Sequence, residues 1–232
     1  MIFAFTSFSF IIFFYNWFDL KSKANFLSIK TIKIKANQCL NNFAGLDFFK
    51  QKNFFIIFFN KEKLKKNLQL LNPQIRTVEI DLPSLNELLL EIDCFFPIAF
   101  LKQDGYFLYL SEDGKILFKK KENTETLPEV FYYQKISNYS YKPGDWLNFK
   151  DLKVALTMIK ALTDLGYNPQ NAEVKSEDFI ILKLNNKNII FSSNKDESQQ
   201  KLELTEILKQ FKIKGRDFQK LDLRFNKPVV VF

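Results

Sequence analysis

The sequence predicts an α+β protein with a single N-terminal transmembrane helix, a small domain, and a larger β-rich domain with two helices. Three observations predict this fold class. An uncharged apolar run opens the chain. The apolar pattern of residues 26–97 predicts the order β-α-α-β-β, and the pattern changes after Pro97. We therefore expect an anchor at residues 1–20, the small domain at 26–97 and the larger domain at 98–232.

The opening run, Met1–Phe18, precedes the first charged residue, Asp19. As a helix rising about 1.5 Å per residue it would span roughly 27 Å, which suffices for the core of a bilayer. Tyr15 and Trp17 stand where interfacial aromatic residues are common. A buried core helix or strand pair is the alternative. The lysines that follow from Lys21 onward would favour a cytoplasmic C-terminus by the positive-inside rule, unless a basic tail precedes Met1.

The small domain is predicted from three strands, a helix, and a poorly defined helical or loop segment between Gln38 and Phe49. Ile32 and Ile34 alternate with lysines, as in a half-buried strand. The segment KEKLKKNLQLL places leucines on one face of a helix that Pro73 ends. Two further strands follow, because apolar and acidic residues alternate on either side of the turn at Pro83-Ser84: Val78, Ile80 and Leu82 before it, and Leu88, Leu90 and Ile92 after it.

The larger domain begins with a predicted hairpin, Tyr106–Leu110 and Lys115–Phe118, around Asp113-Gly114. A helix with Leu152, Leu156 and Ile159 facing inward ends at Gly166, and a second helix covers about Ser198–Gln210. The remaining strands of the larger domain are expected at Ala172–Lys175, Phe179–Leu184, Asn188–Phe191, Leu221–Phe225 and Val229–Phe232. Antiparallel strands are expected in both domains.

Composition excludes several kinds of active site. The 232 residues carry a net charge of +8 and include no histidine, which removes Ser-His-Asp and Cys-His nucleophiles and most zinc sites. No phosphate-binding glycine loop or nucleophile elbow is present. The paired acids Glu79/Asp81 and Glu91/Asp93 alternate along strands, so we expect them on a solvated face. The sequence thus indicates no catalytic residue, no cofactor, no metal and no small-molecule substrate.

Two features leave alternatives open. Cys39 and Cys94 could form one disulfide outside the cytoplasm or remain two buried thiols. The basic balance could indicate nucleic-acid binding or attraction to anionic lipid headgroups. The lysines are interleaved with acids, which argues against nucleic acid as a partner.

The order of segments resembles the FtsQ/DivIB family of bacterial cell-division proteins. FLSIKTIKIKANQ is similar to the opening strand of that family's POTRA domain, and NKEKLKKNLQLLNPQIRTVEIDLPSLNELLLEI to its helix and two later strands. PIAF resembles the junction to the next domain, YFLYLSEDGKILF its hairpin, and LDLRFNKPVVVF its terminal strand pair. Ile80 stands where the family has arginine, and Cys94-Phe95 where it has Glu-Arg, so the sequence indicates a divergent member.

The resemblance implies a non-enzymatic protein of the cell (inner) membrane, single-pass, with its bulk outside the cytoplasm at the division septum. Such proteins bind FtsB-like (DivIC-like) and FtsL-like partners and help regulate septal wall synthesis, while the N-terminal helix contacts membrane lipid. A POTRA-bearing envelope protein of an assembly or transport pathway is the alternative, and a basic nucleic-acid-binding module is a third. Fractionation and localisation at mid-cell would separate the three.

The resemblance also places the partner site on the C-terminal strands. A chain whose last strand is Val229–Phe232, all apolar, can leave an edge with unpaired N–H and C=O groups, although the strand could equally be internal to the sheet. The matching strands of the family receive a partner strand by β-augmentation. We expect Phe225 to be an anchor and Arg224 to be free to pair with an acidic partner residue. The expected partner-binding residues are Leu223, Arg224, Phe225, Val229, Val230, Val231 and Phe232.

Overall fold

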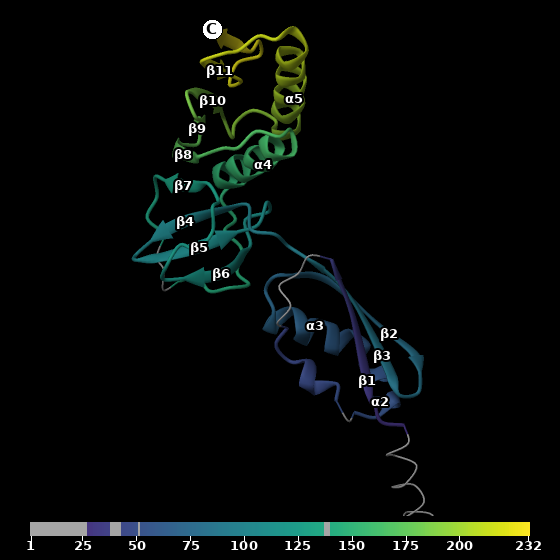
Figure 1. Ribbon diagram of the computed structural model, residues 1–232. Helices are drawn as coiled ribbons and strands as arrows, with labels where there is room; N and C mark the ends of the chain where they lie inside the picture. The colour runs from purple at the N-terminus through teal and green to yellow at the C-terminus, as the bar shows by residue number, and fades with distance from the viewer. Residues whose placement is uncertain (1–26, 38–42, 51, 137–139) are drawn as a thin grey trace, which may run out of the picture. The chain divides into compact units, whose positions relative to one another are not determined.

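The computed structural model describes residues 27–37, 43–50, 52–136 and 140–232 (Figure 1). The chain divides into two compact units, one ending at Cys94 and the other comprising Phe95–Phe232. The division lies three residues before the boundary expected after Pro97. Each unit has its own sheet and its own hydrophobic core.

The predicted fold class is corrected by the structure. The expected transmembrane anchor, residues 1–20, lies outside the described residues, and no helix in the described part is long and apolar enough to cross a membrane. The longest described helix, α5 (Glu197–Lys214), carries charged side chains along its whole length. The described fold is mixed α/β, with one small sheet, one large sheet and four α-helices.

The first unit is a three-stranded sheet with helices packed against it. Strand β1 (Thr31–Asn37) is parallel to β3 (Glu87–Cys94), which is antiparallel to β2 (Ile75–Ser84), in the order β1-β3-β2. A 3-10 helix η1 (Leu46–Phe48) and helices α2 (Phe54–Phe59) and α3 (Lys61–Leu71) connect β1 to β2. The shared core includes Ile57, Leu68, Ile80, Leu88 and Leu90.

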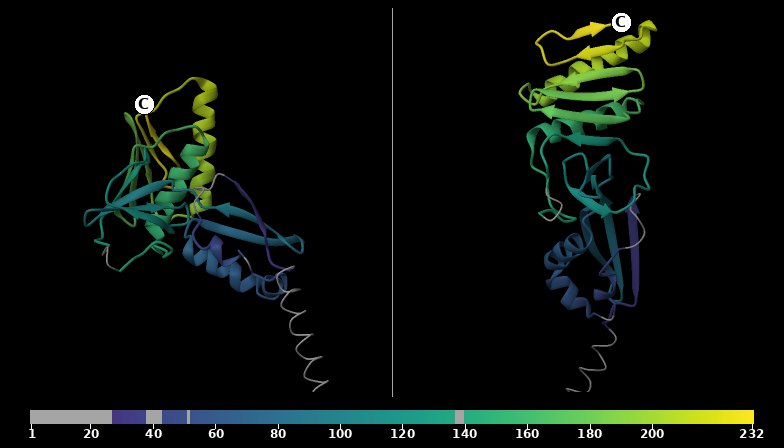
Figure 2. Two further views of the ribbon diagram at one scale, coloured as in Figure 1. Left: turned by 60° about the horizontal axis from the view of Figure 1, so that its bottom comes forward. Right: turned by 90° about the vertical axis from the view of Figure 1, so that its left-hand side faces the viewer.

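The second unit is a nine-stranded sheet in the order β12-β11-β10-β9-β8-β7-β4-β5-β6. The strands are β4 (Ala99–Gln103), β5 (Tyr106–Leu110), β6 (Ile116–Lys120), β7 (Glu129–Tyr132), β8 (Asn171–Ser176), β9 (Phe179–Leu184), β10 (Lys187–Phe191), β11 (Lys220–Asp222) and β12 (Val229–Val231). Helices α4 (Lys150–Asp164) and α5 lie on the same face of this sheet (Figure 2).

The expectation of antiparallel strands throughout was wrong at four places. β1 is parallel to β3, β4 to β7, β7 to β8 and β10 to β11. For the pairs β7–β8 and β10–β11, the reason is the position of the helices. Helix α4 connects β7 to β8 and α5 connects β10 to β11, and a helix that crosses over a sheet returns the chain in its original direction.

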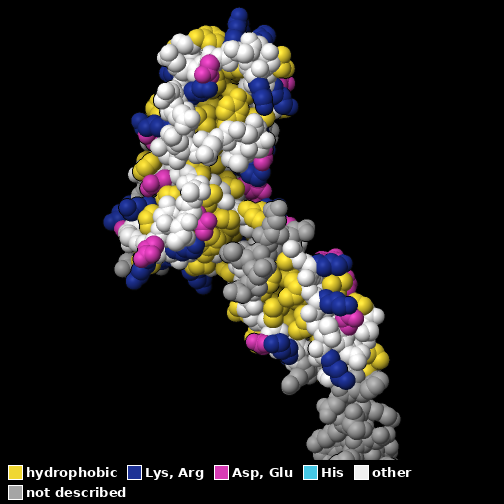
Figure 3. Space-filling model, in the orientation of Figure 1, with side chains coloured by type: hydrophobic (Ala, Val, Ile, Leu, Met, Phe, Trp, Pro, Cys, Tyr) yellow, Lys and Arg dark blue, Asp and Glu magenta, His cyan; other side chains and the backbone are white. Residues whose placement is uncertain are grey.

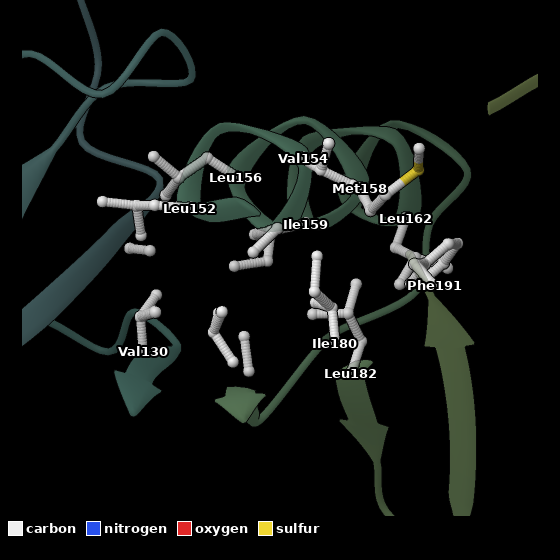
Figure 4. Packing of buried hydrophobic residues seen from close by; sticks show 14 of the residues in the cluster. Val130, Leu152, Val154, Leu156, Met158, Ile159, Leu162, Ile180, Leu182 and Phe191 are labelled. Atoms are coloured by element: carbon white, nitrogen blue, oxygen red, sulfur yellow. The ribbon is translucent and has the colours of Figure 1, made fainter. Parts of the chain in front are cut away.

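Helix α4 forms the centre of the second core. Its side chains Leu152, Leu156 and Ile159 are fully buried, which confirms their predicted inward positions. Figure 4 shows Ile159 pointing from α4 toward the strands of the sheet, and Val130 and Ile180 belong to the same core. α5 packs against α4, and the Thr157 hydroxyl donates a 2.8 Å hydrogen bond to Glu197 at the start of α5. This packing fixes α5 on the sheet beside the C-terminal strands.

Candidate functional site

The C-terminal strands form one end of the large sheet. β12 pairs with β11 in antiparallel register, with Lys220 opposite Val231, Leu221 opposite Val230, and Asp222 opposite Val229. Within the described residues no strand pairs with the outer side of β12. β12 is therefore an edge strand, and the alternative of an internal strand is wrong.

Alternation along β12 decides which side chains reach the surface. Val230 lies opposite buried Leu221 and packs against the core, whereas Val229 and Val231 are exposed on the other face. Phe232 lies beside Phe211 of α5, with ring centroids 6.0 Å apart, and 61% of its surface is exposed. Hydrophobic side chains are visible between the C-terminal strands and α5 (Figure 3).

The expected strand Leu221–Phe225 was wrong beyond Asp222, where β11 ends. The chain turns because Asp222 accepts a 3.2 Å hydrogen bond from the backbone N–H of Arg224, a local bond that competes with the sheet. Leu223 is fully buried, and its N–H donates to the carbonyl of Ile190 at 2.9 Å. Phe225 instead lies on the turn, with 53% of its surface exposed.

Arg224 is not free, contrary to expectation. Its Nε donates to Asp222 Oδ1 at 3.0 Å and its Nη2 to Asp222 Oδ2 at 2.8 Å. Its guanidinium lies over the rings of Phe179, at 4.8 Å, and Phe225, at 5.3 Å. Two parallel hydrogen bonds from a planar group that also stacks on aromatic rings suit arginine and not lysine. Arg224 therefore positions the exposed ring of Phe225.

Lys195 attaches the same turn to the start of α5. Its ammonium donates to the carbonyl oxygens of Leu223 and Phe225, each at 3.0 Å, and forms a 2.6 Å ion pair with Glu203. Only 10% of its side chain is exposed. Sequence reasoning missed Lys195 and Phe179, since nothing local marks them. The spacing of Asp222 and Arg224 could have revealed their contact, because residues two apart share one face of a strand.

We define the C-terminal edge as β12 together with the exposed side chains Phe225, Val229, Val231 and Phe232. Of the expected partner-binding residues, these four are accessible, Val230 is half-buried, Leu223 is buried and Arg224 is paired with Asp222. The four accessible residues lie on β12, on the turn before it and directly after it.

The opposite edge of the same sheet has a different construction. The outer side of β6 is covered at its start, where Ile116 N–H donates to Asp145 O at 2.9 Å and Gly144 N–H donates to Ile116 O at 2.8 Å. Its remaining residues include Lys119 and Lys120, and its pairing with β5 is interrupted by a bulge. Coverage, lysines and bulges are the usual ways of preventing further strand pairing.

The acids singled out from the sequence lie on β2 and β3 of the small sheet. Glu79, Asp81 and Glu91 are exposed, which confirms the expected solvated face, and Asp93 is half-buried. Glu79 lies opposite Glu91, and each forms an ion pair with a lysine: Lys65 at 2.6 Å and Lys35 at 3.0 Å respectively. Among the described residues, no group of three potential ligands could hold a metal ion.

The most perturbed titratable group in the described part is Tyr132. Burial raises the pKa of Tyr132 far above its ordinary value, and the 2.9 Å hydrogen bond that its hydroxyl donates to Asp151 raises it further. The hydroxyl of Tyr132 therefore acts as a hydrogen-bond donor to the buried side chain of Asp151 at the start of α4. Cys94 is buried and disulfide-bonded, and the other cysteine of the chain, Cys39, lies outside the described residues.

Comparison of the chain with protein-family models and with curated proteins gives no match.

Proposed function

We propose that this protein is a non-enzymatic division scaffold of the FtsQ/DivIB type. It binds FtsB-like (DivIC-like) and FtsL-like partners at the septum and thereby helps regulate septal wall synthesis. The C-terminal edge receives a strand of the partner, whose backbone bonds to the free side of β12. In this mode main-chain hydrogen bonds provide affinity, and pockets for alternate side chains provide specificity.

The observation that carries the proposal is the contrast between the two edges of one sheet. The outer side of β6 is covered and lined by lysines, whereas β12 consists of three valines with no charged residue. Exposed Phe225 and Phe232 flank β12 at the two ends of the edge. One edge strand of the sheet, β6, is protected against further pairing and the other, β12, is not. This contrast favours a binding role for β12.

The proposed location is outside the cytoplasm. Disulfides persist in oxidising compartments and are rare in the cytosol of ordinary organisms. Cys94 is disulfide-bonded at the end of β3. This feature supports an extracytoplasmic position, where the septal partners of this family act.

Binding to the FtsB-like or DivIC-like protein from the same organism tests the proposal. Phe225→Lys and Val231→Lys change exposed side chains, so both variants should fold. Each should weaken binding by about tenfold or more, since Phe225→Lys removes an aromatic anchor and Val231→Lys places a charge on the apolar edge. Titration calorimetry with the full chain measures the affinity.

Phe131→Lys is the matched control, because Phe131 is similarly exposed on the same sheet but belongs to β7, away from the C-terminal edge. Partner addition should also slow amide exchange in Val229–Val231. Wild-type affinity in both edge variants, with no protection of β12, would contradict the proposal.

A further inference from the structure

Helix α2 of the first unit presents apolar side chains to solvent. Its sequence is Phe-Phe-Ile-Ile-Phe-Phe, and only Ile57 is buried in the core. Phe55, Ile56 and Phe58 are each about half exposed, and Phe59 is 77% exposed. At 3.6 residues per turn, these four side chains cover about 160° of the helix surface, opposite Ile57. We call them the α2 surface.

The α2 surface is held in place by its neighbours. The side chain of Asn53 caps the helix, accepting a 2.9 Å hydrogen bond from Phe55 N–H. Asn60 closes the other end by donating to the carbonyl of Ile56 at 2.8 Å. The Phe58 ring contacts Phe54 and Phe59, with centroids 6.1 Å and 5.3 Å away. A fixed, exposed aromatic cluster of this kind usually indicates a binding surface.

The acidic residues that flank the α2 segment in the sequence are both paired with lysines, Asp47 with Lys50 and Glu62 with Lys65. No acidic residue occurs from Phe48 to Lys61, a segment that contains Lys50, Lys52 and Lys61. Within the described residues, Lys52 and Lys61 have no ion pair, and the Lys61 ammonium lies 5.8 Å from the Phe58 ring. On the sheet of the same unit, by contrast, Lys33 and Lys35 pair with Glu87 and Glu91.

We infer that the α2 surface docks onto an anionic lipid bilayer. The aromatic side chains would enter the boundary between headgroups and acyl chains, while the flanking lysines extend to the headgroup phosphates. A helix of six residues is only about 9 Å long, too short for the repeated anchors of a helix that fills a protein groove. The surface belongs to the other unit from the C-terminal edge, so the inference does not depend on the proposed function.

The depth of a nitroxide label tests this inference in the full-length protein. Phe59→Cys carries the label on the α2 surface, and Ile213→Cys, which is exposed on α5, carries the matched control label. Vesicles of mixed phosphatidylglycerol and phosphatidylcholine are added, and collisions with oxygen and with a water-soluble nickel complex are measured. The label at position 59 should become accessible to oxygen and shielded from nickel, whereas the label at 213 should stay in water.

Two further comparisons separate lipid from other partners. K52Q/K61Q should raise the lipid concentration needed for half-maximal burial of the label at 59 by about tenfold or more, and K201Q/K209Q on α5 should not. A label at 59 that stays accessible to nickel on the vesicles overturns the inference. Shielding without lipid that grows with protein concentration also overturns it, because a second copy would then cover the surface. If the label at 59 is buried equally in vesicles of pure phosphatidylcholine, the lysines and the anionic headgroups have no role in docking.

Discussion

Asp222 keeps its carboxylate ionised although only 4% of the residue is exposed. Burial raises the pKa of Asp222, but the hydrogen bonds from the side chain and backbone of Arg224 outweigh burial, so the pKa lies below its ordinary value. The reciprocal contact raises the pKa of Arg224. At the scale of single residues, this pair ends β11, turns the chain and supports the exposed ring of Phe225.

The pair predicts a pH dependence. Because the folded pKa of Asp222 is depressed, its contribution to stability is present above its unfolded pKa of about 3.9 and is lost as pH falls through the folded value. Arg224→Met removes the side-chain hydrogen bonds and the charge of the guanidinium but keeps burial and the backbone N–H of residue 224, so the pKa of Asp222 should rise from its depressed value. NMR titration of the side-chain carboxyl measures it.

Asp217 is the control in that titration. Its pKa is lowered by Lys187 and by the backbone N–H of Phe218, neither of which involves Arg224. The titration of Asp217 should therefore be the same in Arg224→Met and in the wild type. An unchanged Asp222 titration in the variant would show that Arg224 does not hold the carboxylate ionised.

At the scale of elements, α5 determines where the last two strands lie. Its packing on α4 fixes one side, Phe211 contacts Phe232, and Lys195 just before its first turn binds two carbonyls of the turn between β11 and β12. β12 itself has only three residues. Such a short strand depends on these external contacts more than on its own pairing.

Lys195→Met should release this turn. The substitution leaves Glu203 without its ion pair and removes the donor to two carbonyls, which should cost about 1–3 kcal/mol. Lys201→Met, at an exposed position of α5, should change stability by less than about 0.5 kcal/mol. Urea unfolding gives both values. Equal stability of the two variants would mean that Lys195 does not hold the turn.

For the whole molecule, the sequence patterns predicted single helices and strands better than they predicted which strands pair. The spacing of Leu152, Leu156 and Ile159 predicted the buried face of α4, and the strand expected at Phe179–Leu184 is β9 with the same bounds. The sequence did not reveal that β7 lies between β4 and β8, because the crossovers that make strands parallel leave no local signal.

The same limit applied to the candidate site. Apolar valines predicted a strand at the C-terminus, and its position at the edge follows from the order of the whole sheet. The contacts of Arg224 with Phe179 and of Lys195 with Phe225 join residues 30 or more positions apart. No periodicity reports contacts of that kind, so these two long-range contacts could be found only in the structure.

The separate cores predict that the second unit folds alone. Every buried residue of its core lies within Phe95–Phe232, and every one of the other core lies before Phe95. A fragment of these residues should unfold in one cooperative transition, with an enthalpy of about 90–100 kcal/mol near 60 °C from its length. Calorimetry measures this enthalpy, and the calorimetric and van't Hoff values should agree.

The fragment should also bind the division partner as tightly as the full chain, because the whole C-terminal edge belongs to it. A fragment that folds cooperatively but does not bind would contradict the placement of the partner site, whereas one that fails to fold would contradict the independence of the unit.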